Sequence, residues 1–263
     1  MDQQRRWRLA VRAVSFVVCT AIVLAIAARW ERVPYGQLLV GCSTSIGTLL
    51  LTAFFVRWEG LRLNDVGAQL VRGSLPRFAA AFLGGLTLPF LRAGIGMLLT
   101  HTHYENSGSF TVTAALLSLA TYVALACREE LAFRGYPLRR LESGFGTWPA
   151  QLLIAALFAT EHVLGGWTWK QALLGAGVGS ILFGAAALRT RGLAVPIGLH
   201  AAWNFGDWML GGKETAGLWK PVLEMEASGH AGTIQMVSYL AVMITATAVV
   251  WFWPRGSMKT TMS

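Results

Sequence analysis

The chain has 263 residues and a formal net charge of +9, and its composition is that of a membrane protein. Charged residues make up 13% of it, about half of the ~25% that is typical of soluble domains, while 54% of the residues are apolar. Such a chain cannot cover a water-exposed surface with charge. These values exclude a disordered protein, a collagen-like repeat and a coiled coil, and they leave almost no room for a soluble globular enzyme.

Eight apolar runs approach the length of about 20 residues that a helix needs to cross a bilayer. In chain order they are 13–28, 36–56, 78–99, 111–127, 148–160, 171–188, 193–210 and 236–253. We therefore predict an all-α polytopic membrane protein with about eight transmembrane helices. Because no long polar or Pro/Ser-rich linker separates the runs, we expect one helical membrane domain over residues 1–263.

Most of the 22 lysines and arginines fall on one side of these eight predicted spans. That side also holds both termini, and it includes the four arginines between Arg5 and Arg12. Since cytoplasmic connections carry the excess of positive charge, we expect both termini to be cytoplasmic. The first span could instead be a cleavable signal peptide, which would leave seven spans.

Neither the positive charge nor the cysteines predict another kind of protein. The basic residues interrupt apolar runs and form no stripe with interleaved aromatic residues, so they do not indicate nucleic-acid binding. Cys19, Cys42 and Cys127 lie within or beside apolar stretches without a CxxC pair. We interpret them as small buried side chains rather than as a disulfide framework.

Ionisable residues within a membrane domain are costly and indicate function, and the first cluster of them ends the fourth apolar run. Glu130 and Arg134 are four residues apart, so on a helix they can form an ion pair. Glu129 lies about 100° further round such a helix and can face elsewhere. A salt-bridged helix end at the membrane border is the simpler interpretation, but a single arginine cannot easily neutralise two adjacent glutamates.

Two further clusters lie on later spans. His162 ends the fifth run and, taken alone, is interpreted most simply as an ordinary interfacial histidine. His200 and Asn204 lie within the seventh run, four residues apart, and therefore share one helix face. They could connect two helices by a hydrogen bond, or they could both donate hydrogen bonds into a water-filled cavity.

Together these residue types are a set suited to hydrolysis by an activated water molecule. Burial in an apolar site disfavours the charged form of a glutamate, which makes it a stronger base toward water. An imidazole beside it can hold the same water. His200 and Asn204 could then stabilise the oxyanion that forms when water attacks a peptide carbonyl.

At these residues the chain resembles the CAAX prenyl endopeptidase and bacteriocin-processing family (CPBP, also called Abi), whose best-known branch is the type II CAAX prenyl proteases. The resemblance covers a core from about Leu116 to Leu210. Three motifs carry it, in the family's order: Glu129-Glu130-xxx-Arg134, Phe158-xxx-His162 and His200-xxx-Asn204.

The resemblance implies a helical fold whose site opens toward the cytosol and the membrane. It implies that Glu129 is the glutamate that activates water and that His162 assists it. His200 and Asn204 resemble the pair that stabilises the oxyanion, while Glu130 and Arg134 resemble supporting residues that hold the glutamate helix. The family is usually described as glutamate proteases without an obligatory metal, so we expect no cofactor, with zinc as the alternative that two Glu and two His leave open.

The expected substrate is a membrane-delivered peptide or lipidated protein that is cut near its C-terminus, and no nucleic acid is expected to bind. The compact Ala-, Gly- and Arg-rich chain with short loops is typical of a bacterial inner-membrane protein. Two other functions remain open. One is a non-catalytic scaffold or bacteriocin-immunity factor, and the other is a transporter that uses the Glu and His residues as a proton relay, although no inverted repeat supports it.

Overall fold

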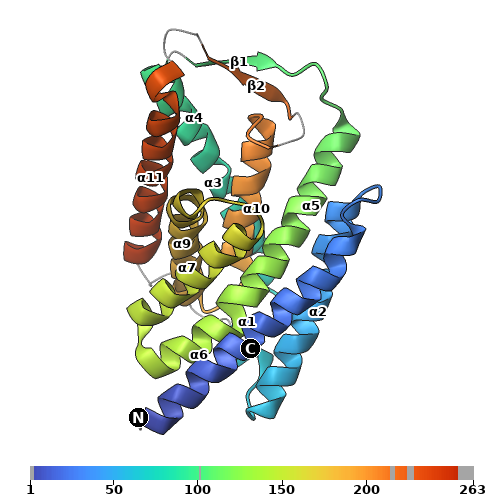
Figure 1. Ribbon diagram of the computed structural model, residues 1–263, viewed down its shortest axis with the longest axis vertical. Coiled ribbons are helices and arrows are strands. Elements are labelled where there is room, and N and C mark those ends of the chain that lie inside the picture. Colours follow the sequence, from blue (N-terminus) through green and yellow to red (C-terminus); the bar gives the residue numbers. More distant parts are fainter. Residues whose placement is uncertain (1–2, 101, 214–216, 224–227, 254–263) are drawn as a thin grey trace.

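The computed structural model describes residues 3–100, 102–213, 217–223 and 228–253, which are almost entirely helical (Figure 1). In the first half of the chain the elements are α1 (Gln3–Ala27), η1 (Ala28–Trp30), α2 (Gly36–Trp58), η2 (Leu63–Val66), α3 (Ser74–Gly85), α4 (Thr87–Thr100), β1 (His103–Asn106) and α5 (Val112–Glu130). In the second half they are η3 (Leu131–Gly135), α6 (Tyr136–Phe145), α7 (Thr147–Leu164), α8 (Trp169–Gln171), η4 (Ala172–Gly177), α9 (Val178–Thr190), α10 (Ala194–Met209), β2 (Trp219–Val222) and α11 (Ser228–Phe252).

The fold is that of an all-α polytopic membrane protein. Six helical segments of the described chain are long and apolar enough to cross a membrane: Gln3–Trp30, Gly36–Trp58, Ser74–Thr100, Val112–Phe145, Trp169–Thr190 and His230–Phe252. The other two predicted spans correspond to α7 and α10, which are helices of 18 and 16 residues. Both carry polar residues of the predicted site.

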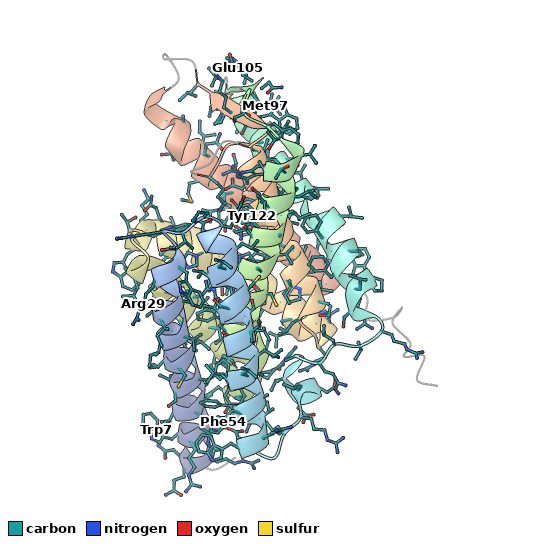
Figure 2. All side chains as sticks on the ribbon, turned by 90° about the vertical axis from the view of Figure 1, so that its right-hand side faces the viewer. Trp7, Arg29, Phe54, Met97, Glu105 and Tyr122 are labelled. Carbon is teal, nitrogen blue, oxygen red and sulfur yellow. The ribbon has the colours of Figure 1, made fainter. Side chains whose placement is uncertain are left out.

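The outer surface of the helices is apolar. On α1 a stripe of large apolar residues points outward with helical spacing, and Val18, Ile22 and Ile26 are all more than half exposed. Figure 2 shows outward side chains along the whole bundle, with Trp7 near one end and Glu105 at the other. An apolar stripe of this length is unfavourable in water but matches a lipid environment.

Helix α10 lies inside the bundle and packs against α3, α5 and α9 (Figure 1). Glycine allows the closest approach: a Cβ atom at Gly198 would lie 2.6 Å from the carbonyl oxygen of Phe78 in α3. Small residues at such contacts let helix backbones pack tightly in membranes. The helix that carries His200 and Asn204 is therefore held on several sides.

The predicted span 78–99 is divided into α3 and α4, with the break at Leu86. Pro89 lies in the first turn of α4, where it removes a backbone donor that a continuous helix would need. Beyond α4, β1 pairs with β2 in antiparallel register, with His103 opposite Val222. This two-stranded sheet caps one end of the bundle, opposite the start of α1 (Figure 1).

The prediction for the cysteines was wrong for Cys42, which is exposed on α2, whereas Cys19 and Cys127 are partly buried. The exposed face of α2 also presents apolar residues such as Leu50 and Phe54. In a membrane protein, an apolar residue can face lipid as readily as it can be buried, because lipid replaces water as the solvent. An apolar stretch of sequence therefore does not predict burial within the protein.

Candidate active site

The two adjacent glutamates lie where α5 changes its winding. Helix α5 begins at Val112, after Thr111, whose hydroxyl accepts a hydrogen bond from the backbone N–H of Ala114, and it ends at Glu130. The π-helical turn η3 follows directly, and α6 begins at Tyr136 with Pro137 as its second residue. Because Pro137 has no N–H, the usual i→i−4 bond cannot form there, which favours a wider turn. Single π-helical turns frequently occur at functional sites.

Glu130 and Arg134 form the predicted ion pair, and both side chains are completely buried. Arg134 Nη1 lies 3.4 Å from Glu130 Oε1, and the guanidinium lies over the ring of Phe158 at 4.4 Å from its centroid. The same Glu130 oxygen lies 2.8 Å from Nδ1 of His200. Glu130 thus joins α5, the turn that follows it and α10.

His200 lies between the two glutamates. Its Nδ1 contacts Glu130, and its Nε2 lies 3.5 Å from Oε2 of Glu129. The ring stacks on Phe183 of α9, with centroids 4.3 Å apart and an interplanar angle of 12°. Because one nitrogen is engaged by Glu130 and one ring face is covered, the other nitrogen is directed at Glu129.

Glu129 is also held by a guanidinium. Arg128 Nη2 lies 2.5 Å from Glu129 Oε1, and the same arginine pairs through Nη1 with Glu161 of α7. The guanidinium favours the charged carboxylate, which opposes the effect of burial that the sequence predicts. Arg128 therefore links two carboxylates and leaves Oε2 of Glu129 directed toward His200.

His162 lies one helical turn after Phe158 on α7. Its Nδ1 lies 2.9 Å from the backbone oxygen of Phe158, and its ring packs between Phe158 and Trp167. Since a carbonyl oxygen only accepts, Nδ1 carries a proton, and Nε2 makes no hydrogen bond to the residues that the structure describes. The imidazole lies close enough to interact with the charge of Glu129, and the Phe158 ring lies beside both His162 and His200.

Asn204 has a different partner. Its Oδ1 accepts a hydrogen bond of 3.2 Å from the ammonium of Lys213. It lies on the same helix as His200 and one turn later. The structure thus brings Glu129, Glu130, Arg134 and His200 into direct contact and places His162 beside them, whereas Asn204 joins this group through its helix.

Two contributors to the cluster, Arg128 and Glu161, have no role in the motif-based prediction. The sequence did offer a signal for a second cation: two adjacent glutamates, Glu129 and Glu130, cannot both be neutralised by one arginine when they are buried. Glu161 lies 33 residues from Arg128 in sequence. Its contact therefore depends on how α5 and α7 pack, which local spacing does not predict.

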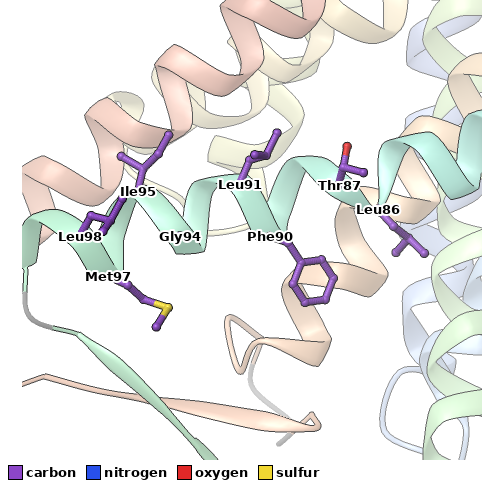
Figure 3. A pocket seen from close by; sticks show the side chains of 8 residues that line it. All are labelled: Leu86, Thr87, Phe90, Leu91, Gly94, Ile95, Met97 and Leu98. Atoms are coloured by element: carbon purple, nitrogen blue, oxygen red, sulfur yellow. The ribbon is translucent and has the colours of Figure 1, made fainter.

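Two other features could provide a candidate site in the described chain: a cluster of metal ligands and an apolar pocket along α4. Within the described residues, no group of three or more His, Cys, Asp or Glu is arranged to hold a metal ion. A pocket of about 800 Å³ lies along α4, and Figure 3 shows that Phe90, Leu91, Met97 and their neighbours line it. Its lining contains no titratable side chain, so it offers apolar contact but no acid or base.

The comparison with known families agrees with the position of the cluster. A family model described as Type II CAAX prenyl endopeptidase Rce1-like matches residues 110–206. This stretch begins just before α5 and ends within α10, so it contains all the motif residues. No curated protein matches the chain. Over residues 110–206 the chain is therefore similar to the Rce1-like type II CAAX prenyl endopeptidases, a family of membrane peptidases.

Proposed function

We propose that this protein is a glutamate-type intramembrane endopeptidase in which Glu129 activates the attacking water. The observation that carries this proposal is the position of His200, with Nε2 at 3.5 Å from Glu129 and Nδ1 at 2.8 Å from Glu130. In the proposed roles, Glu129 is the base and His200 is a hydrogen-bond donor beside it on a different helix, and water-mediated attack on a carbonyl needs both.

In the proposed reaction, Glu129 takes a proton from water while the water oxygen bonds to the carbonyl carbon of the scissile peptide. His162 holds the same water through its Nε2. The negative oxygen that forms accepts hydrogen bonds from His200 Nε2–H and from the amide of Asn204. The C–N bond then breaks, and the proton on Glu129 passes to the leaving nitrogen, which yields a free amine and a new carboxylic acid that loses its proton to water.

Glu130 and Arg134 support this chemistry without touching the substrate. The proposed donation from Nε2 requires a proton on both ring nitrogens of His200, and the carboxylate of Glu130 is the acceptor for Nδ1–H. Arg134 compensates the buried charge of Glu130. Both side chains are fully buried, so neither is accessible to a substrate.

The membrane setting suits a substrate that is delivered by lipid. The proposed substrate is a membrane-delivered peptide or a lipidated protein, cut near its C-terminus, as the family name implies for prenylated CAAX sequences. The proposed location is a bacterial inner membrane, with both termini and the site toward the cytoplasm. We propose that the reaction proceeds without a bound metal.

Comparison of protein C-termini tests the proposal even though the natural substrate is not identified. Cells that produce the wild type or the Glu129→Gln variant at equal abundance are compared by mass spectrometry of C-terminal peptides. We expect shortened C-termini that depend on the wild type and are absent with Glu129→Gln, whereas Glu105→Gln in β1 behaves as the wild type. Identical C-terminal profiles for the wild type and Glu129→Gln would contradict the proposal.

A further inference from the structure

The hydrogen bond between Lys213 and Asn204 fixes the orientation of the asparagine amide. An ammonium group has three donors and no acceptor, so the atom of Asn204 that faces Lys213 at 3.2 Å must be the carbonyl oxygen Oδ1. The amide nitrogen is then turned away from Lys213. Within the described residues it makes no hydrogen bond, so its two N–H groups are available to another acceptor.

Lys213 is itself held in place by a charged network at the end of α10. Its Nζ lies 3.6 Å from Oδ2 of Asp207, and Oδ1 of Asp207 accepts a hydrogen bond of 2.8 Å from Arg92 of α4. The ammonium also lies 6.0 Å from the ring centroid of Tyr122 in α5. Contacts from α5 and α10 therefore restrict where the lysine side chain can go, and Arg92 of α4 holds the Asp207 carboxylate that pairs with it.

The backbone after α10 turns so that Lys213 returns to the helix that it has just left. Gly211 has φ +72°, a conformation that glycine adopts without steric cost and other residues rarely adopt. The N–H of Gly212 then donates to the carbonyl oxygen of Asp207 at 2.8 Å. A left-handed glycine after the last turn is a common way to end a helix, and here it brings a cation back to Asn204.

We propose that Lys213 is a positioning residue that holds the Asn204 amide with its N–H donors directed at the substrate oxyanion. This inference rests on the proposed function and names the group that makes Asn204 a donor. The positive charge at Oδ1 also polarises the amide, because hydrogen bonds in a chain strengthen one another. Without Lys213 the amide can rotate and present its oxygen, which repels an oxyanion.

Side-chain NMR tests the contact directly. The chain has only three asparagines, Asn64, Asn106 and Asn204, so selective ¹⁵N-Asn labelling of the detergent-solubilised protein gives three side-chain NH₂ signals. We expect Lys213→Met to shift the Asn204 signal and leave the other two in place, and Lys213→Arg to preserve it. An Asn204 signal that does not change in Lys213→Met would overturn the proposal.

Kinetics tests what the contact does. With a farnesylated peptide that ends in a CAAX sequence, we expect Lys213→Met to lower kcat about 10²-fold, the size typical of a small misplacement of a catalytic group, with KM within about twofold. Lys213→Arg should restore most of kcat. Lys220→Met, which removes an exposed lysine of β2 paired with Glu105, is the matched control and should leave both constants unchanged.

A double variant separates positioning from a general structural role. If Lys213 acts through Asn204, Lys213→Met should have no further effect on kcat in an Asn204→Ala background. Independent, multiplying losses would overturn the proposal even if each single variant is impaired. A wild type that cleaves no peptide and changes no C-terminus would instead overturn the proposed function, and with it the catalytic role of Lys213, while the NMR result still decides whether the contact exists.

Discussion

Substitution of Arg134 by Met tests the buried ion pair on which the site is built. The guanidinium is completely buried, lies 3.4 Å from Glu130 and packs over Phe158 at 4.4 Å. Met fills a similar volume but leaves the buried carboxylate of Glu130 with His200 as its remaining charged or protonatable contact. We therefore expect Arg134→Met to lower the free energy of unfolding by about 3–5 kcal/mol, as is usual when one partner of a buried pair is removed.

Much of this loss should come from the carboxylate that is left behind, not from the absent attraction. Glu130→Gln in the same chain removes the uncompensated charge, so the double variant Glu130→Gln/Arg134→Met should be more stable than Arg134→Met alone. Denaturation in mixed detergent micelles, followed by tryptophan fluorescence, measures these free energies. Lys220→Met, at an exposed ion pair, serves as the control and should unfold as the wild type does.

Two results would refute this reasoning. A loss of less than about 1 kcal/mol for Arg134→Met is the size found for exposed pairs and would mean that Arg134 is solvated. A double variant that is less stable than both single variants would mean that the stranded charge of Glu130 is not the cause.

Three other predictions concern packing, electrostatics and metal. Gly198→Ala places a Cβ atom against the backbone of α3 and should lower the free energy of unfolding by about 1–3 kcal/mol. Gly94→Ala is the control, because a Cβ atom there meets open space, and it should cause no such loss. Equal stability of the two variants would argue against close α3–α10 packing. Glu161→Gln removes one of the two carboxylates that share Arg128, so the guanidinium interacts more strongly with Glu129 and makes it a weaker base. For the farnesylated peptide we expect kcat to fall about tenfold, the effect of one charged hydrogen bond, while KM is unchanged. An unchanged kcat would contradict this. Treatment of the purified protein with EDTA and 1,10-phenanthroline should leave its peptidase activity intact, and an activity that is lost on chelation and restored by zinc would overturn the metal-free proposal.

The sequence predicted those features of the fold and site that depend on local spacing. Apolar runs indicated the helices, and the four-residue spacing of Glu130 and Arg134 predicted an ion pair that the structure confirms. Both follow from helix geometry alone. The break between α3 and α4 was not predicted, although Pro89 marks its position. A run of apolar residues identifies a span by its hydropathy, and the backbone N–H that proline lacks does not change the hydropathy.

For distant segments, the sequence predicted which residues meet in the site but not which atoms contact each other. The motifs indicated that Glu129, His162, His200 and Asn204 act together, but not that Nδ1 of His200 contacts Glu130, 70 residues away. Helix rotation and tilt decide which nitrogen faces which glutamate, and these depend on packing. In the same way, the lysine that contacts Asn204 lies beyond α10, in a stretch without any motif.

Single-turnover hydrolysis by the Glu129→Gln variant tests the central claim most directly. The purified wild type and the variant are reconstituted in liposomes with the farnesylated CAAX peptide, and the cleavage rate and the dissociation constant are measured separately. If Glu129 activates the water, the rate should fall by about 10²–10⁴-fold, the contribution of a general base, while peptide binding stays within about twofold of the wild type. Cleavage by Glu129→Gln at the wild-type rate would contradict the account.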